Sequence, residues 1–445
     1  AVYVMEQILD KHKYGVVSEP THYYRKRANN SSAIQGKEKA LDWYKVTPQR
    51  FYKKLMDISV QKWGCVIPFV QYAVWYDLQW RLNDRIHMVL DEEERRLYAK
   101  ELQSLLKNCE DDIIIKQRDI NLKKKLFLLS LKYNEDVSDQ IVCRDSKLYF
   151  HNIQILDLQK NALSRADVIE IKQNALCISG KIDFNFTNEL ELFFIDDKGE
   201  KYPVTLIKLE GAEGKIWNKK VTDVYFYDIR IDISQIKWLE IRAVFRDDFL
   251  FRPKIVFGKF SKFYNRAIKA DYYAQGAYML TTDLHRIYIR TCDKQVEKQQ
   301  EQQFCEELQN LEIDDAVKKE ALWYRKRYFV ARKLHRRKIW LISDRINVAG
   351  DNGEAFFRYL AKTRPADVEF YFVISSESKD YVRIKKIGKV IPYGSKKCKL
   401  YTLLADKIIS SLGEDNIVNP FYGLKPYVGN LFRYDYVFLQ HGIIK

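Results

Sequence analysis

The chain has 445 residues, of which 47% are hydrophobic and 14% aromatic, so it has enough apolar material for several folded domains and is not globally disordered. Its formal net charge of +16 indicates a polyanionic partner, and nucleic acid, anionic lipid and a phosphate-bearing polymer all satisfy that charge. The seven cysteines form no C-x-x-C pair, which favours reduced core cysteines over disulfides or a metal site. No apolar run reaches the roughly 18 residues of a membrane span.

Residues 1–90 are predicted to be mainly helical, because apolar residues from Thr47 to Arg85 recur at spacings of three and four. A basic triplet, Arg25, Lys26 and Arg27, precedes a polar loop. Guanidinium groups match phosphate oxygens, so the triplet is a candidate phosphate site, and a solvated basic turn is the alternative. Residues 91–143 are charged, helix-prone and free of Gly and Pro, which predicts a helical linker.

Residues 144–294 change to a period of two, which predicts an antiparallel β-sandwich. Gly180 falls on the apolar phase of its strand, as a bulge or a close approach requires. The turn from Asp196 to Gly199 predicts a hairpin. Aromatic residues of these strands suit either the core or a glycan-contacting surface. They are Tyr225, Phe226, Tyr227, Phe245, Phe249 and Phe251.

Residues 295–337 contain no Gly or Pro and predict one helix that ends in basic and aromatic residues. Such a helix suits the anionic cytoplasmic face of a membrane, at about 1 kcal/mol per Lys or Arg. No nucleic-acid fold signature accompanies it, so we predict no nucleic-acid partner. An ordinary exposed helix is the alternative. The basic residues are Arg325, Lys326, Arg327, Arg332, Lys333, Arg336, Arg337 and Lys338.

Residues 338–445 alternate strand and helix, which predicts a parallel, doubly wound α/β domain. The carboxyl ends of parallel strands are where ligands bind in such sheets. Arg345 and the turn from Gly350 to Glu354 follow the first strand, and His441-Gly442 follow the last. We expect Asp351 or Asn352 to cap a helix N-terminus that accepts an anion; a plain capped turn is the alternative.

Four segments of the helical region resemble the C-terminal tail of bacterial family 2 glycosyltransferases. They are Tyr23–Arg27, Ser31-Ser32, Trp43-Tyr44 and Tyr76–Arg81. The resemblance implies a GT-A fold and a nucleotide-sugar donor. The family's metal-binding motif and catalytic acid lie upstream of this tail, so it carries over no catalytic residue, and any divalent metal would belong to that upstream part.

Residues 338–445 resemble the N-terminal half of the CDP-glycerol glycerophosphotransferase family, the teichoic-acid and capsule polymerases. The resemblance rests on Ser343–Arg345, Gly350–Ala355, Tyr359-Leu360 and Gln440–Gly442. It implies a GT-B fold with two Rossmann-like halves, of which this is the first. It also implies transfer of glycerol phosphate, or a related polyol or sugar phosphate, from a CDP donor to a growing polymer at the inner face of the membrane.

The resemblance makes His441 the general base. A hydroxyl that attacks a phosphoryl group needs a proton acceptor with a pKa near neutrality, as histidine supplies. Gly442 would let the backbone approach the substrate. Many wall polymerases continue with Thr-Pro-Leu-Lys, whereas this chain has Ile443-Ile444-Lys445, which leaves the transferred group open. The residues expected to bind acceptor or substrate are Gly442, Arg345, Asp351, Asn352, Gly353 and Glu354.

We therefore expect a multidomain α/β and β protein: a GT-A tail (1–90), a linker (91–143), a β-sandwich (144–294), a basic helix (295–337) and the first half of a GT-B domain (338–445). A start without Met and an end four residues after His441 predict a fragment, inactive alone, that lacks the CDP-binding half and holds no cofactor. The expected partners are an anionic polymer acceptor or lipid-linked glycan and the anionic cytoplasmic membrane surface. A non-catalytic membrane- or glycan-binding scaffold is the alternative.

Overall fold

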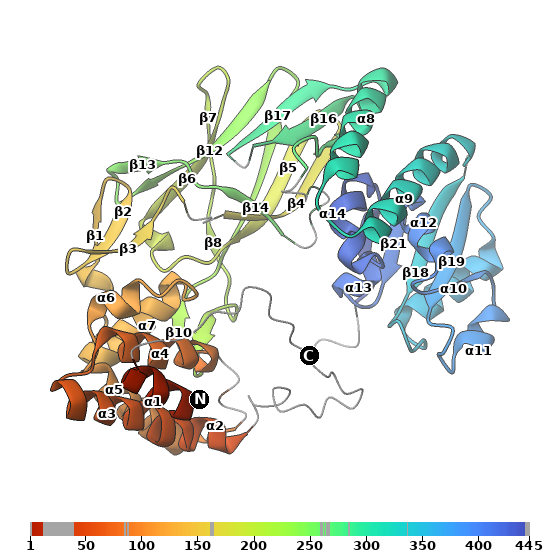
Figure 1. The fold of residues 1–445 in the computed structure, drawn as a ribbon. Coiled ribbons are helices and arrows are strands. Elements are labelled where there is room, and N and C mark those ends of the chain that lie inside the picture. The colour runs from red at the N-terminus through yellow and green to blue at the C-terminus, as the bar shows by residue number, and fades with distance from the viewer. Residues whose placement is uncertain are drawn as a thin grey trace.

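The computed structural model describes residues 2–11, 40–83, 86, 89–160, 164–258, 261, 263, 268–283, 285–335 and 337–440. Helices form its first part, antiparallel sheets its middle and a parallel sheet with helices its last part (Figure 1). This arrangement confirms a multidomain protein of mixed helices and sheets.

The helical part uses one hydrophobic core throughout. Its helices are α1 (Val2–Lys11), α2 (Leu41–Lys45), the π-helix η2 (Pro48–Lys53), α3 (Lys54–Trp63), α4 (Pro68–Leu78), the 3-10 turn η3 (Gln79–Arg81), α5 (Glu92–Leu106), α6 (Asp111–Ile115), α7 (Leu122–Tyr133) and the 3-10 turn η5 (Ser138–Gln140). Leu102 and Leu128 are buried in the same cluster as Tyr44 and Trp75. The segment predicted as a linker is therefore packed, because α5 and α7 each bury an apolar face.

Two of the segments that resemble the family 2 tail contact each other. Arg81 is 1% exposed, donates from Nε to the Trp43 carbonyl at 2.9 Å and pairs with Asp77. Its guanidinium lies 4.5 Å from the centre of the Trp43 ring, a cation–π contact. These motif residues therefore stabilise the helical core of this part.

The described residues in the middle of the chain form three antiparallel sheets and a further sheet that includes one parallel pair of strands. The strands are β1 (Val142–Arg144), β2 (Lys147–Phe150), β3 (Ile153–Asp157), β4 (Ser164–Lys172), β5 (Ala175–Ile182), β6 (Leu190–Asp196), β7 (Lys201–Pro203), β8 (Ile207–Lys208), β9 (Gly214–Ile216), β10 (Lys219–Thr222), β11 (Tyr225–Asp232), β12 (Trp238–Phe245), β13 (Phe249–Phe251), β14 (Ile255–Phe257), β15 (Tyr273–Gln275), β16 (Tyr278–Thr282) and β17 (Arg286–Thr291), with the 3-10 turn η6 (Thr187–Glu189).

The two largest sheets run β14-β4-β5-β11-β8 and β15-β16-β17-β12-β6-β7, and most of their buried residues join one core, while Ala274 and Met279 pack in a second cluster with the helices that follow β17. All their pairings are antiparallel, as predicted, except that β14 pairs with β4 in parallel. Gly180 is a close-approach site: a Cβ there would lie 1.9 Å from the Arg165 carbonyl oxygen. Tyr227, Phe245 and Phe251 are buried, which favours the core reading for these aromatics.

The predicted single helix over 295–337 is two helices, α8 (Lys294–Asn310) and α9 (Asp315–Leu334). The carboxylate of Asp314 accepts hydrogen bonds from the backbone N–H groups of Ala316 and Val317. An N-cap of this kind starts a new helix without any Gly or Pro. The prediction of one continuous helix was wrong for this reason.

Arg325 corrects the predicted membrane surface. Arg325 is fully buried. Its guanidinium makes two contacts with the Glu301 carboxylate of α8, and the contact from Nε is 2.8 Å long. It also donates to the Tyr427 carbonyl at 2.7 Å and to Asn430 Oδ1 at 2.9 Å. Arg325 therefore ties α8 and α9 to the end of the chain and does not face a membrane.

Residues 338–440 form the predicted parallel α/β unit, with strand order β20-β19-β18-β21-β22. Its elements are β18 (Lys338–Ser343), α10 (Asn352–Thr363), β19 (Val368–Ile374), α11 (Tyr381–Lys385), β20 (Val390–Pro392), α12 (Lys396–Leu404), β21 (Lys407–Ser410), α13 (Asp415–Val418), η7 (Tyr422–Leu424), α14 (Lys425–Val428), η8 (Gly429–Leu431) and β22 (Asp435–Phe438). The chain reverses its winding direction between β18 and β21, and such a switch point is where ligands bind.

We predict that Arg325→Ala lowers the free energy of unfolding by about 3–5 kcal/mol, because it leaves the Glu301 carboxylate without its buried partner. Chemical denaturation followed by circular dichroism measures this loss. Arg327→Ala, an exposed site on the same helix, is the matched control and should cost about 0.5 kcal/mol or less. Equal losses in the two variants would contradict the assigned role of Arg325.

Candidate functional site

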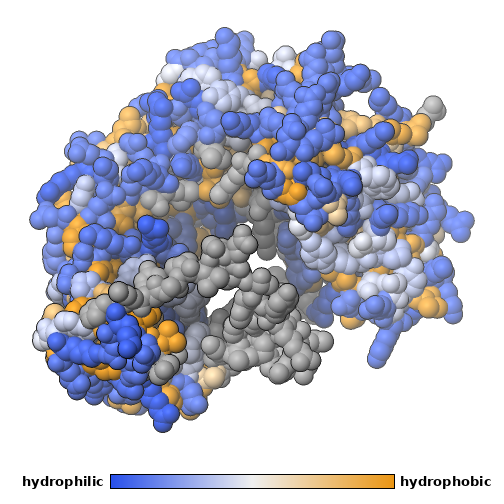
Figure 2. All heavy atoms as spheres, in the orientation of Figure 1, coloured by the Kyte–Doolittle hydropathy of each residue, from blue (hydrophilic) through white to orange (hydrophobic). Residues whose placement is uncertain are grey.

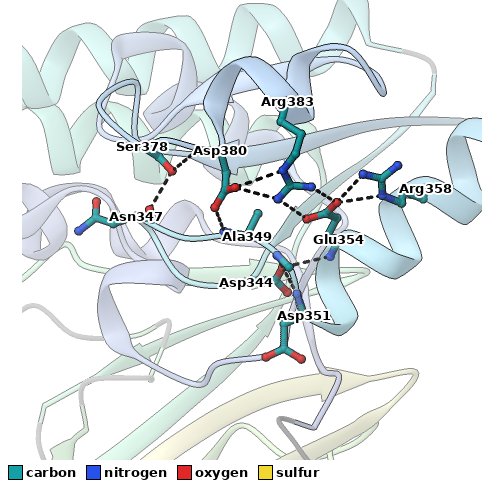
Figure 3. Close-up of polar contacts among 10 residues, drawn as sticks. Asp344, Asn347, Ala349, Asp351, Glu354, Arg358, Ser378, Asp380 and Arg383 are labelled. Atoms are coloured by element: carbon teal, nitrogen blue, oxygen red, sulfur yellow. Dashed lines mark hydrogen bonds and ion pairs between the residues drawn. The ribbon is translucent and has the colours of Figure 1, made fainter.

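The carboxyl edge of the parallel sheet is organised around the buried carboxylate of Asp344, which directly follows β18 and is 2% exposed. It accepts hydrogen bonds from the backbone N–H groups of Gly350 (3.2 Å) and Gly353 (2.7 Å). It also accepts from those of Asp351 (3.1 Å) and Glu354 (3.2 Å), which Figure 3 labels beside it. Ser411, just after β21, donates from its hydroxyl at 2.9 Å. The carboxylate thus joins the ends of two strands to the start of α10.

Asp344 changes the meaning of the predicted anion site. The first N–H groups of a helix attract an anion, and here the chain's own carboxylate takes that position. The arrangement corresponds to the plain capped turn, with Asp351 as N-cap accepting from the Asn352 N–H at 2.8 Å. The sequence contained the signal, an Asp directly after a strand and a few residues before a glycine-containing turn, but the N–H partners of that Asp were not predicted.

Gly353 has a packing role in this cap. A Cβ at this position would lie 2.4 Å from Asp344 Oδ1 and 2.5 Å from the Ser343 carbonyl oxygen. Gly350 has a φ of +123°, in the left-handed region that favours glycine. Both glycines therefore let the turn close over Asp344.

Asn352 connects the start of α10 to the end of β22. Its side-chain amide donates to the Leu439 carbonyl at 3.1 Å and to the Gln440 carbonyl at 2.7 Å. These are the last two described residues, and the predicted base, His441, is next in the sequence. The structure shows that Asn352 contacts the backbone of the chain, and its predicted contact with substrate stays a prediction.

Glu354 lies at the centre of an ion-pair network. Its carboxylate pairs with Arg358, at 2.7 Å, and with Arg383, and Arg383 also pairs with Asp380 at 2.9 Å (Figure 3). The hydrogen bonds from Arg383 and Arg358 hold the pKa of Glu354 below its ordinary value. Asp380 accepts from the Ala349 N–H at 3.0 Å, which lowers its pKa together with Arg383. The network fastens the turn before α10 to α11.

The remaining predicted residues divide into exposed and undescribed ones. Arg345 is exposed on the loop after β18, where its backbone N–H donates to the Val348 carbonyl. The side chains of Lys326, Arg327, Arg332, Lys333, Arg337 and Lys338 are exposed. The following lie outside the described residues: Arg25, Lys26, Arg27, Arg336, His441 and Gly442.

Among the described residues, no cluster of three or more His, Cys, Asp or Glu side chains is arranged to hold a metal ion. In the same part of the chain, no helix combines the length and apolar character needed to cross a bilayer.

A known protein resembles this chain along nearly its whole length. Residues 324–445 match the family described as CDP-Glycerol:Poly(glycerophosphate) glycerophosphotransferase. The chain is 28% identical to the minor teichoic acid biosynthesis protein GgaB of Bacillus subtilis (strain 168), over 98% of this chain and 49% of that protein. It is 27% identical to the minor teichoic acid biosynthesis protein GgaA of the same strain, over 32% of each.

The parallel α/β unit and this match together point to a family of transferases. Residues 324–445 carry the similarity to the CDP-glycerol glycerophosphotransferase family, and both relatives are named as minor teichoic acid biosynthesis proteins. The chain spans about half the length of the first of these relatives and about a third of the second.

We predict that Glu354→Gln lowers the free energy of unfolding by roughly 1–3 kcal/mol at neutral pH, because two charge-assisted pairs are lost. The folded pKa of Glu354 is depressed, so its contribution is present above the unfolded pKa and is lost as the pH falls through the folded pKa. The difference between wild type and variant should therefore shrink on acidification. Urea unfolding at a series of pH values measures it.

Glu377→Gln is the matched control, since Glu377 is exposed on the same domain. It should change stability little at any of these pH values. A wild-type advantage over Glu354→Gln that stays constant down to the acid end of the series would contradict the assigned ion pairs.

Proposed function

We propose that the full-length protein transfers glycerol phosphate, or a related polyol or sugar phosphate, from a CDP donor to a growing teichoic-acid or capsule polymer. The family of residues 324–445 and the match to GgaB along nearly the whole chain support this activity. The observation that carries it is the fastened end of β22, from which the chain continues directly into His441-Gly442. That end lies on the carboxyl edge of the sheet, one strand away from the switch point between β18 and β21.

In the proposed reaction His441 acts as the general base. The acceptor hydroxyl gives its proton to the imidazole while its oxygen attacks the β-phosphorus of the CDP-linked donor. The bond from that phosphorus to the bridging oxygen breaks, and CMP leaves with the electron pair. Gly442 offers backbone without a side chain beside the reacting groups.

The finer architecture belongs to the same proposal. The strand order β20-β19-β18-β21-β22 is the order 3-2-1-4-5 of a doubly wound sheet, which supports a Rossmann-like first half of a GT-B fold. The second half would bind the CDP donor. The proposal also includes a family 2 glycosyltransferase module to which residues 1–90 form the tail. Any divalent metal would belong to that module.

We predict that His441→Ala lowers CMP release by at least 10²-fold, since general-base catalysis contributes about that much. The assay incubates full-length protein with CDP-glycerol, a nucleotide sugar and a lipid-linked acceptor. His151→Ala, at an exposed histidine in the turn between β2 and β3, is the control and should keep wild-type activity. Wild-type CMP release no greater than that of His441→Ala would leave the scaffold alternative as the better reading.

We also propose that the exposed face of α9 contacts the anionic cytoplasmic surface of the membrane. Trp323, Val330 and Leu334 are 39%, 50% and 75% exposed, although all three are large and apolar. With Arg327 they recur at helical spacing on one face, and the Arg327 guanidinium lies 5.6 Å from the Trp323 ring centre. On the side drawn in Figure 2, hydrophilic residues cover most of the surface and apolar ones are scattered. An apolar strip flanked by cations suits a lipid interface.

We predict that the triple change Lys326→Ala, Arg327→Ala and Lys333→Ala weakens binding to anionic vesicles by about 3 kcal/mol, at about 1 kcal/mol per charge. Liposome flotation with phosphatidylglycerol vesicles measures the bound fraction. The control removes three exposed lysines near α11, Lys379, Lys385 and Lys386, and should bind as wild type. Equal flotation of both triple variants would contradict a membrane role for α9.

A further inference from the structure

The sheet hydrogen bonding of β22 ends just before the motif that carries the proposed chemistry. The last contact is from the Leu439 N–H to the Ser410 carbonyl of β21, at 2.8 Å. Gln440 then has a φ of +31°, in the left-handed region that non-glycine residues seldom adopt. A residue held in this region is strained, so its surroundings must supply support.

Asn352 supplies that support. A side-chain amide nitrogen carries two hydrogens, and here one carbonyl oxygen accepts each of them, that of Leu439 and that of Gln440. Because both partners are acceptors, the nitrogen and not the oxygen of the amide must face the strand end. Both hydrogens are thereby used within the chain.

Contacts with Asp344 fix the position of Asn352. It is the first residue of α10, and the carboxylate of Asp344 binds the N–H groups of the residues on both sides of it, Asp351 and Gly353. Ser411 ties the same carboxylate to β21. A continuous line of contacts therefore runs from the central strands through Asp344 and α10 to the backbone at Gln440.

We infer that Asn352 is a positioning residue, whose side-chain amide fixes the backbone from which His441 extends. The inference deepens the proposed function and rests on it for the role of His441. A displacement of about 1 Å in a reacting group reduces a rate by about 10²-fold. The two hydrogen bonds of Asn352 hold the residues just before His441, so their loss should lower kcat strongly. Asn352 acts through the backbone and not by holding substrate.

Asn352→Asp tests this with little effect on folding. The aspartate has the same shape but presents an oxygen to both carbonyls, so both hydrogen bonds are lost. The side chain is exposed and its shape is unchanged, so the fold should be kept and the thermal midpoint should fall only slightly through the two lost hydrogen bonds. Asn347→Asp is the matched control, because Asn347 is exposed on the loop before α10 and undergoes the same change of charge.

Two measurements on full-length protein decide the inference. Hydrogen–deuterium exchange at the Leu439 amide should be at least tenfold faster in Asn352→Asp than in Asn347→Asp. The kcat for CMP release should fall about 10²-fold at an unchanged KM for CDP-glycerol and for the lipid-linked acceptor. Unchanged exchange would overturn the inference, and so would a rise in KM at wild-type kcat, which marks a substrate contact.

The exchange experiment also separates this inference from the proposed function. Faster exchange in Asn352→Asp establishes that the strand end is anchored, whatever reaction the protein performs. Absence of CMP release from wild type would overturn the proposed function and leave the exchange result standing.

Discussion

The buried carboxylate of Asp344 is the interaction on which the carboxyl edge of the parallel sheet depends. It accepts four backbone N–H groups from the turn before α10 and one hydroxyl from the loop after β21. Each of these donors would otherwise be a polar group at a largely buried helix start, with a cost of about 1–3 kcal/mol. The Asp344 side chain therefore accepts the hydrogen bonds of the α10 N-terminus and holds β18, β21 and α10 together.

The hydrogen bonds of Asp344 and its neighbours also explain the residue types in the motif Gly350–Ala355. Gly350 and Gly353 let the turn close on Asp344, Asp351 caps the helix, Asn352 reaches the end of β22, and Glu354 binds the arginines of α10 and α11. These contacts show that the motif, which a family resemblance assigns to substrate binding, also builds the carboxyl edge of the sheet in this chain.

Arg325 is a second buried charge that holds distant parts of the chain together. Arg325 and Glu301 pair between α8 and α9, and Arg325 also donates to the carbonyl of Tyr427 and the side chain of Asn430. A buried pair of this kind is costly to break and specifies one geometry. It joins the two helices that follow the antiparallel sheets to the last turns before β22. The basic sequence around Arg325 therefore has one buried, structural residue among exposed ones.

The sequence alone determined the order of element types, the parallel α/β nature of residues 338–440, and the resemblance of the C-terminal part to a transferase family. Those features follow from local periodicity and short motifs. The break at Asp314, the packed segment 91–143, the burial of Arg325 and the contacts of Asp344 and Asn352 were decided by tertiary structure. Each depends on partners that lie far along the chain, such as Glu301 for Arg325 and Gln440 for Asn352, and periodicity holds no information about such partners.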